Sequence, residues 1–499
     1  MATSNTLPRA IRASVPSEQN GDGNLAQVLE SLDLDGTRRN LQNVKAVALL
    51  NPEIKSIAIE RGRQRENGQI MGPLHGVPFL VKDTFVTMDE MDTTGGSYAL
   101  LGAKYEVEST VISRLREAGA IILGKTNMSE WGWSRSPKCP NGWSALWGQA
   151  LGGFHEKQDP EGSSSGSAIA ACMNMASFTL GGETCGSILS PAKRNGVVGL
   201  KPTIGLTSRA GTLPVNPEYD TVGPISRYVK DCAIILQAIA GRDEHDSATA
   251  DIPFDKIPSY ADFYSTDGLV GVRIAVPRSI YNVADSDLEV GVAFREAVEK
   301  IQSLGAVIVD DIDFNLWKPG SEQREGVFGN VLLREAFEKF FGQVETHPHE
   351  IKNISDLITF TKATLKEHAS DVHITSKDDE FSIIKSRMEA LGEDLVHMLD
   401  THGCDVLLAT SSADLPLDLG RLPGISVPLG LYSKDRCVVT DSKGLVTEGP
   451  NIPFAITFTG RRYSEQKLIA YAYAFEQATL VVEQNKDRLI IQPGKNLRK

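Results

Sequence analysis

The sequence EGSSSGSAIAACMNMASFTLGGETCGSILSPAKRNGVVGLKPTIGL occupies residues 161–206 and is the most unusual part of the chain. Two loops of small residues, 162–167 and 181–187, flank the apolar residues 168–180, which predict a buried helix followed by a strand. Glycines in such loops permit close approach of the backbone to a ligand. The serines can act as nucleophiles, bind phosphate or only form turns. Because the stretch contains no GxxxxGK[ST] motif, a P-loop is not supported.

Units of helix, glycine and strand lie on both sides of this stretch. Residues 111–123 contain apolar positions at helical spacing, a glycine and a short apolar run. Residues 286–309 repeat the same order. This order is typical of the αβ half of a βαβ unit, so it predicts an α/β fold with a mostly parallel, helix-covered sheet. Further strands are expected at 77–81, 269–276 and 406–409.

The composition is that of a globular protein. The chain has 499 residues, of which 41% are hydrophobic and 23% charged. The 51 Lys and Arg residues against 64 Asp and Glu residues give a net charge of −13, which disfavours binding to nucleic acid or to anionic lipid. We expect a cytoplasmic protein without a membrane span, because residues 1–20 contain no apolar signal region and no apolar run reaches 18 residues.

The chain is expected to begin with a polar, flexible arm at residues 1–24. Residues 25–499 are expected to form the folded domain. Residues 315–400 are charged, have a helical pattern and contain few strand signals. They predict a helical insertion that covers one face of the domain.

Five sequence motifs follow one another in a fixed order along the chain. The serine-rich block contains GSSSGSA and GSI, and GVVGLKPT follows at 196–203. The other four motifs are GVPFLVKD at 76–83, GKTNMSEW at 124–131, LPGISVP at 422–428 and PFAITF at 453–458. Together they make the chain resemble the amidase signature family over roughly residues 25–485, and it looks most like stand-alone amidases of fungi.

The resemblance implies a single large α/β domain built on a mixed, twisted sheet covered by helices. It also implies hydrolysis of a carboxylic amide by a Ser–cis-Ser–Lys triad. By position, Ser187 matches the nucleophile, Ser163 the cis-serine and Lys82 the lysine. The same alignment implies backbone oxyanion donors at Thr184, Cys185 and Gly186, and substrate-binding positions at Gly132, Ser163, Met128 and Trp131.

This triad needs a lysine that has lost its proton. A serine hydroxyl is a weak nucleophile until a base accepts its proton, and lysine is a base only when neutral. Lysine has an ordinary pKa near 10.4, so holding it neutral at pH 7 costs roughly 4–5 kcal/mol. Burial among serines and apolar groups can lower the pKa by that amount.

The chain departs from the family pattern near the nucleophile. Glu183 stands where many members have Asp, and the position of their usual arginine is taken by Leu189. We therefore expect Lys193 or Arg194 to supply the charge that balances Glu183. Cys185 lies inside the predicted oxyanion loop, where its side chain either turns away from the substrate, alters the shape of the site or acts as a second reactive thiol.

Two other functions stay open in the sequence. An acyl transferase or amide synthase would pass the same acyl-enzyme to an amine, and a non-catalytic binding protein would use the amidase scaffold without turnover. A small-molecule amide is the expected substrate, and a homodimer is possible. No metal or other cofactor is expected, and none of the histidines falls within the five motifs.

Overall fold

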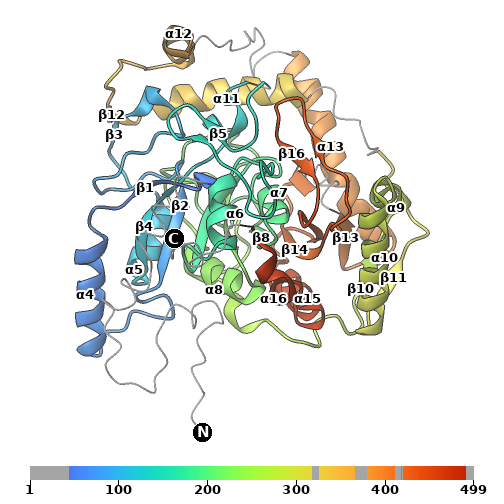
Figure 1. Cartoon of the computed structure of the whole chain (residues 1–499). Coiled ribbons are helices and arrows are strands. Elements are labelled where there is room, and N and C mark those ends of the chain that lie inside the picture. Colours follow the sequence, from blue (N-terminus) through green and yellow to red (C-terminus); the bar gives the residue numbers. More distant parts are fainter. Residues whose placement is uncertain are drawn as a thin grey trace.

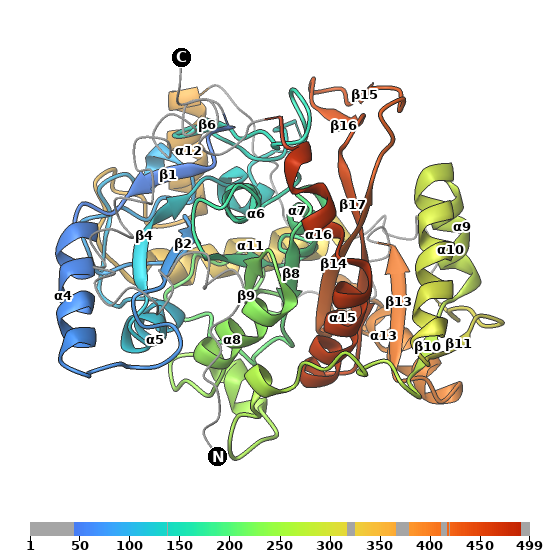
Figure 2. The same cartoon turned by 60° about the horizontal axis from the view of Figure 1, so that its bottom comes forward.

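The computed structural model describes residues 44–136, 138–316, 325–365, 379–410, 417–418 and 420–490. Within these ranges, 11 strands form one sheet that helices flank (Figure 1 and Figure 2). In spatial order the strands are β1 (Val47–Leu50), β4 (Ile121–Thr126), β2 (Pro78–Lys82), β7 (Phe178–Glu183), β9 (Thr221–Ser226), β8 (Val198–Lys201), β14 (Gly424–Leu431), β17 (Pro453–Thr459), β13 (Val406–Thr410), β10 (Arg273–Ala275) and β11 (Val307–Val309).

The sheet is mixed. Strand β2 is parallel to its neighbours β4 and β7, and β10 is parallel to β11 and β13. From β7 through β9, β8, β14 and β17 to β13, every adjacent pair is antiparallel. The mixed sheet implied by the family resemblance is confirmed, whereas the mostly parallel sheet predicted from the helix–glycine–strand units is wrong. Those units lie toward the two ends of the sheet, while β14 and β17 in its middle are joined through the short hairpin of β15 (Val439–Thr440) and β16 (Val446–Glu448).

Both predicted helix–glycine–strand units are present. Helix α5 (Thr110–Glu117) precedes β4, and α10 (Leu288–Ser303) precedes β11. Asp287 caps α10 by accepting hydrogen bonds from the backbone N–H groups of its first turn. The strand predicted at 269–276 is shorter, because residues 266–271 form turns.

Helices pack on both faces of the sheet. Helices α6 (Ser165–Cys172) and α7 (Leu189–Arg194) lie together on one face, while α5, α8 (Val229–Ile239) and α15 (Glu465–Thr479) form the other layer (Figure 2). Strand β2 contributes to both layers, since Phe79 and Val81 pack with α5 and α8, whereas Leu80 packs with Ile169 of α6. Side chains alternate along a strand, so Lys82 points to the same face as Leu80. The start of α6 and the start of α7 lie on that face.

Three helices lie in the region where the sequence predicts a helical insertion. They are α11 (Glu325–Phe341), α12 (Ile354–Leu365) and α13 (Asp379–Thr401). In Figure 1, α11 crosses the upper part of the molecule. The strand that follows α11, β12 (Val344–Thr346), pairs with β3 (Lys104–Tyr105), which lies between β2 and β4 in the sequence. The limits of the insertion stay predictions, and the arm predicted at 1–24 lies outside the described residues.

The remaining elements complete the layers. They are α4 (Ile54–Glu66), α9 (Arg278–Asp285), α16 (Val481–Asn485) and the small hairpin of β5 (Trp143–Ser144) and β6 (Gly148–Gln149). None of the described helices combines the length and the apolar character needed to cross a membrane.

Gly223 provides a test of the close packing between β9 and β8. A Cβ atom at this position would lie 2.1 Å from the Leu200 carbonyl oxygen and 2.8 Å from Cδ of Pro202. Gly223→Ala is therefore expected to lower the free energy of unfolding by about 1–3 kcal/mol, as measured by urea denaturation. Gly182→Ala on the adjacent β7 is the control, because its nearest neighbour would be 3.7 Å away. Equal losses in the two variants would contradict this packing.

Candidate active site

Three polar side chains from distant parts of the chain form a continuous hydrogen-bonded series. Lys82 ends β2, Ser163 lies two residues before α6, and Ser187 lies two residues before α7. The Lys82 Nζ atom donates to Ser163 Oγ at 2.7 Å, and Ser163 Oγ donates to Ser187 Oγ at 3.0 Å. All three side chains are buried, and Ser187 is 8% exposed. This arrangement can carry a proton from one serine through the other to the lysine.

The two serine loops are also joined through their backbones. The Ser164 N–H donates to the Ser187 carbonyl oxygen at 3.1 Å. The Ser164 hydroxyl and the Lys82 Nζ atom both donate to the Gly182 carbonyl oxygen, at 3.1 and 2.9 Å. The peptide bond between Gly162 and Ser163 is cis. The end of β7 is therefore a common anchor for the lysine and the first serine loop.

The electrostatic state of Lys82 follows from its burial. Loss of water contact lowers the pKa of Lys82 from 10.5 to about 7, while the carboxylates of Asp220 and Glu183 act in the opposite direction. A substantial share of the lysine is therefore neutral near pH 7, and a neutral amine can accept a proton.

Asp220 acts on Lys82 through its charge and holds the loop that precedes Ser187. Its carboxylate accepts from Thr184 Oγ1 at 2.5 Å and from the backbone N–H of Val215 at 2.8 Å. The N–H of Asn216 also donates to this carboxylate, at 2.9 and 3.0 Å to its two oxygens. Burial raises the pKa of Asp220, and these hydrogen bonds oppose that effect. Asp220 was not found by sequence reasoning, because its contact with Thr184 spans 36 residues and no local pattern marks it.

Glu183 has backbone partners. One of its oxygens accepts from the N–H groups of Ile188 and Leu189, at 2.5 and 2.9 Å, at the start of α7. The expectation that Lys193 or Arg194 balances Glu183 is wrong. Both basic side chains instead contact Glu161, because they lie at the far end of α7 from the carboxylate of Glu183.

A cavity of about 350 Å³ opens onto this series. Lys82 and Ser163 line it, and the Ser187 hydroxyl, which is not among the lining groups, lies 3.0 Å from that of Ser163. The apolar part of the wall includes Tyr105, Val107, Leu213, Pro214, Val215, Ala336 and Phe340, of which the last two belong to α11. Charged side chains on the wall include Glu106, Glu183, Arg209, Asp220, Asp246 and Lys339. Within the described residues, no group of three or more His, Cys, Asp and Glu side chains is arranged to hold a metal ion.

The predicted substrate-binding positions differ in their placement. Gly132 lines the cavity, and a Cβ atom there would lie 2.5 Å from Cγ2 of Val215 and 3.9 Å from Ser163 Oγ. Met128 is fully buried, and Trp131 is 4% exposed and packs edge-on against Phe337 of α11. Neither is among the residues that line the cavity, so we do not carry them into the proposed site. Aromatic residues such as those in 124–133 are found both in protein cores and in cavity walls, so the sequence alone could not tell which role they have.

The predicted oxyanion loop connects β7 to α7. Thr184 lines the cavity, Cys185 is exposed, and Gly186 has a φ of 69° in the left-handed region that favours glycine. The turn at Gly186 brings Ser187 back toward Ser163. Thr184 is held in place by Asp220.

Comparisons with known proteins agree on one family. A family model described as Amidase matches residues 37–469. A protein of Arthroderma benhamiae that is named as an amidase is 39% identical over 473 residues, which cover 91% of this chain and 79% of that protein. A protein of Arabidopsis thaliana with a similar name is 34% identical over 456 residues, covering 87% of this chain and 83% of that protein. The crystal structure of the peptide amidase from Stenotrophomonas maltophilia matches with a TM-score of 0.79 at 32% identity, covering 93% of this chain and 98% of that one.

The carboxylates near Lys82 lead to a prediction about pH. The hydrogen-bonded series predicts that Ser187 reacts with a fluorophosphonate only when Lys82 is neutral, so the labelling rate should rise with pH through about 7. Asp220 raises the pKa of Lys82, and Asp220→Asn should therefore move this rise to lower pH. The measurement is the labelling rate against pH by intact mass.

Asp246→Asn is the control for this experiment. Asp246 lines the same cavity but is paired with Arg209 at 2.6 Å, so its replacement should leave the midpoint in place. A midpoint that stays unchanged or rises in Asp220→Asn would contradict the role given to Asp220.

Proposed function

The chain belongs to the amidase family, and from that premise we propose that it hydrolyses a carboxylic amide through an acyl-enzyme on Ser187. The observation that carries the proposal is the series from Lys82 Nζ to Ser163 Oγ and on to Ser187 Oγ, with distances of 2.7 and 3.0 Å. Both distances are within the range for proton transfer along hydrogen bonds.

In the first half of the reaction, Ser187 Oγ attacks the amide carbonyl carbon. When Lys82 is neutral, both hydrogen bonds reverse, so that Ser187 donates to Ser163 and Ser163 donates to Nζ of Lys82. The proton of Ser187 then passes to Ser163 Oγ as the proton of Ser163 passes to Nζ. The tetrahedral intermediate then collapses, and Ser163 delivers a proton to the leaving nitrogen while it regains one from Lys82. The amine departs, and the acyl group is left as an ester on Ser187.

In the second half, water takes the place of the leaving amine. It attacks the ester carbonyl while the same series accepts its proton, and the carboxylic acid leaves as Ser187 regains its hydrogen. All protons that move in the two halves are supplied by the substrate, by water and by these side chains.

A negative charge develops on the carbonyl oxygen during the attack. We assign its stabilisation to the loop between β7 and α7. The backbone N–H groups of Thr184, Cys185 and Gly186 are the proposed donors. The hydrogen bond from Thr184 to Asp220 supports this assignment, because it fixes one end of the loop before substrate arrives. Donors held in advance stabilise the transition state more than mobile ones, and loss of one typically costs about 10²–10³ in rate.

The cavity supports a substrate with a sizeable apolar group. Its volume of about 350 Å³ and the side chains of Tyr105, Leu213 and Phe340 favour an aryl or large aliphatic group next to the scissile amide. Gly132 is the proposed neighbour of the reacting carbonyl. The similar solved structure from Stenotrophomonas maltophilia is that of a peptide amidase, which supports an amide of an amino-acyl or peptide type.

The identity of the second nucleophile separates hydrolysis from acyl transfer. We assign water, because the relatives that are 39% and 34% identical over most of the chain are named as amidases. A biosynthetic acyl transferase would instead form a new amide from the same acyl-enzyme. The cytoplasmic location, the homodimer and the lack of nucleic-acid partners stay predictions from the sequence.

Labelling with a fluorophosphonate tests the nucleophile. The wild-type protein should gain the mass of one adduct, and Ser187→Ala should gain none, because the phosphonyl group bonds to the activated serine oxygen. Lys82→Met should reduce the labelling rate by at least about 100-fold, since general-base assistance typically contributes that much. An adduct that persists in Ser187→Ala would overturn the assignment.

A second assay tests the reaction. Anilides and amides with an aryl acyl group should be converted to the free acid by the wild type and not by Ser187→Ala. In the presence of a competing amine, a product that is mainly acid supports hydrolysis, whereas a product that is mainly the new amide establishes acyl transfer. Binding without turnover, with no adduct, would support the non-catalytic reading.

A further inference from the structure

We propose that the ion pair of Arg194 with Glu161 is a positioning device that clamps the loop of Ser163 to helix α7, which follows Ser187. The inference rests on the proposed function, because it concerns the distance over which the two serines exchange a proton. Arg194 and Glu161 are given no role in the steps above.

The ion pair is largely shielded from water. Arg194 donates from Nη2 and from Nε to one oxygen of Glu161, at 2.5 and 3.0 Å, and its Nη1 atom donates to the carbonyl oxygen of Thr447. The side chains of Arg194 and Glu161 are 14% and 15% exposed. Lys193 lies 3.8 Å from the same carboxylate oxygen. All three nitrogens of the guanidinium group are thus hydrogen-bonded, to two different acceptors.

Two further contacts tie the same segments together. Gln158 Nε2 donates to the carbonyl oxygen of Arg194 at 2.7 Å, and Asn195 Nδ2 donates to that of Pro160 at 3.1 Å. The side chains of Gln158 and Asn195 are fully buried. The end of α7 is therefore joined to residues 158–161 at three successive points.

These contacts can fix the positions of Ser163 and Ser187, because only short stretches of chain separate them from the two serines. Ser163 lies two residues after Glu161, and Ser187 lies at the other end of the single helix that carries Arg194. The Ser165 hydroxyl also donates to the carbonyl oxygen of Glu161. A displacement of α7 relative to Glu161 would change the 3.0 Å distance between the hydroxyls of Ser163 and Ser187.

The two basic side chains of the clamp stabilise the ionised form of Glu161. Burial raises the pKa of Glu161, but Lys193 and Arg194 outweigh it and hold that pKa below its usual value. The carboxylate therefore stays ionised at neutral pH. Removal of Arg194 would leave a buried charge without its main partner, and such a charge moves toward water or gains a proton. Either change would loosen the loop that carries Ser163.

A misplaced Ser163 affects some substrates more than others. The nitrogen of an anilide must receive a proton before it can leave, and Ser163 supplies it. A nitrophenyl ester releases a stable phenolate, which leaves without a proton. Loss of the clamp should therefore slow anilide hydrolysis more than hydrolysis of the ester with the same acyl group.

The experiment compares these two substrates in Arg194→Met, Glu161→Gln and the double variant. We expect kcat for the anilide to fall at least about tenfold more than kcat for the ester, with KM nearly unchanged, because proton delivery is worth at least that factor. The double variant should be no worse than the worse single variant, because both changes break one pair. Arg194→Lys, which keeps the charge, should recover part of the lost ratio.

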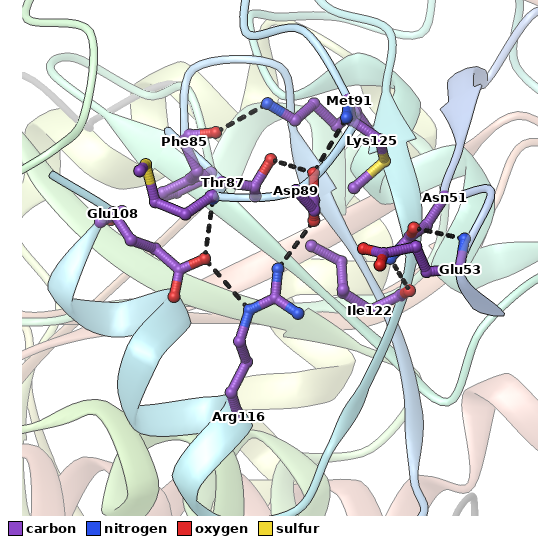
Figure 3. Close-up of polar contacts among 12 residues, drawn as sticks. Asn51, Glu53, Phe85, Thr87, Asp89, Met91, Glu108, Arg116, Ile122 and Lys125 are labelled. Carbon is purple, nitrogen blue, oxygen red and sulfur yellow. Dashed lines mark hydrogen bonds and ion pairs between the residues drawn. The ribbon is translucent and has the colours of Figure 1, made fainter. Parts of the chain in front are cut away.

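Arg116→Met is the matched control. Figure 3 shows Arg116 between Asp89 and Glu108, with contacts of 2.7 and 3.1 Å. These side chains are 27%, 2% and 14% exposed, which is similar to the clamp, and none of the three is among the residues that line the cavity. The control should lower thermal stability without changing the ratio of anilide to ester turnover.

Hydrogen exchange separates the clamp from the proposed function. In Arg194→Met, amide exchange should become faster in both 158–165 and 186–195, while Arg116→Met should leave these segments unchanged. Unchanged exchange in Arg194→Met would overturn the clamp. Faster exchange with an unaltered turnover ratio would overturn its effect on Ser163. If the wild type hydrolyses neither substrate, the proposed function fails, and the exchange data alone still decide whether the clamp exists.

Discussion

The site depends on keeping the amino group of Lys82 away from water. Strand β2 lies inside the sheet between two parallel neighbours, and helices cover both of its faces. Its last residue therefore projects into a protein interior, where the protonated form loses its hydration and the pKa falls to about 7. The carboxylates of Asp220 and Glu183 limit that fall. The balance between burial and these two charges sets the pH at which the lysine can accept a proton.

The topology explains how such a lysine meets two serines. Strands β2 and β7 run parallel, with Val81 paired to Leu180, so their carboxyl ends lie at one edge of the sheet. Lys82 and the Gly182 carbonyl oxygen consequently come within hydrogen-bond distance. The loops that lead into α6 and α7 carry the serines to the same edge. Ligand sites of α/β sheets commonly form at such edges, and here the edge opens into the cavity of about 350 Å³.

Local patterns and ordered motifs were sufficient to predict much of this arrangement. The helix–glycine–strand units predicted α5 with β4 and α10 with β11, because a helix stop and a buried run are encoded by neighbouring residues. The motifs also pointed to Lys82, Ser163 and Ser187, which the fold brings together. The contacts that were predicted wrongly, or not predicted at all, join residues that lie far apart in the sequence. Neither the pairing of Arg194 with Glu161 nor the contact of Asp220 with Thr184 leaves a trace in local spacing. Burial of Trp131 against α11 likewise depends on a helix about 200 residues away.

The origin of the cavity wall has an evolutionary consequence. Lys82, Ser163 and Ser187, the proposed reacting groups, lie within residues 82–187, whereas Ala336 and Phe340 reach the cavity from α11. Strand β12 pairs with β3 through Val344 and Tyr105 and so holds that region in place. One part of the cavity wall is thus inherited on a stretch of chain separate from these three residues. Substitutions along α11 can change the shape of the cavity while the hydrogen-bonded series of Lys82, Ser163 and Ser187 stays intact. Because α11 carries none of Lys82, Ser163 and Ser187, the shape of the group that fits the cavity can change by substitutions in one helix that leave these three residues in place.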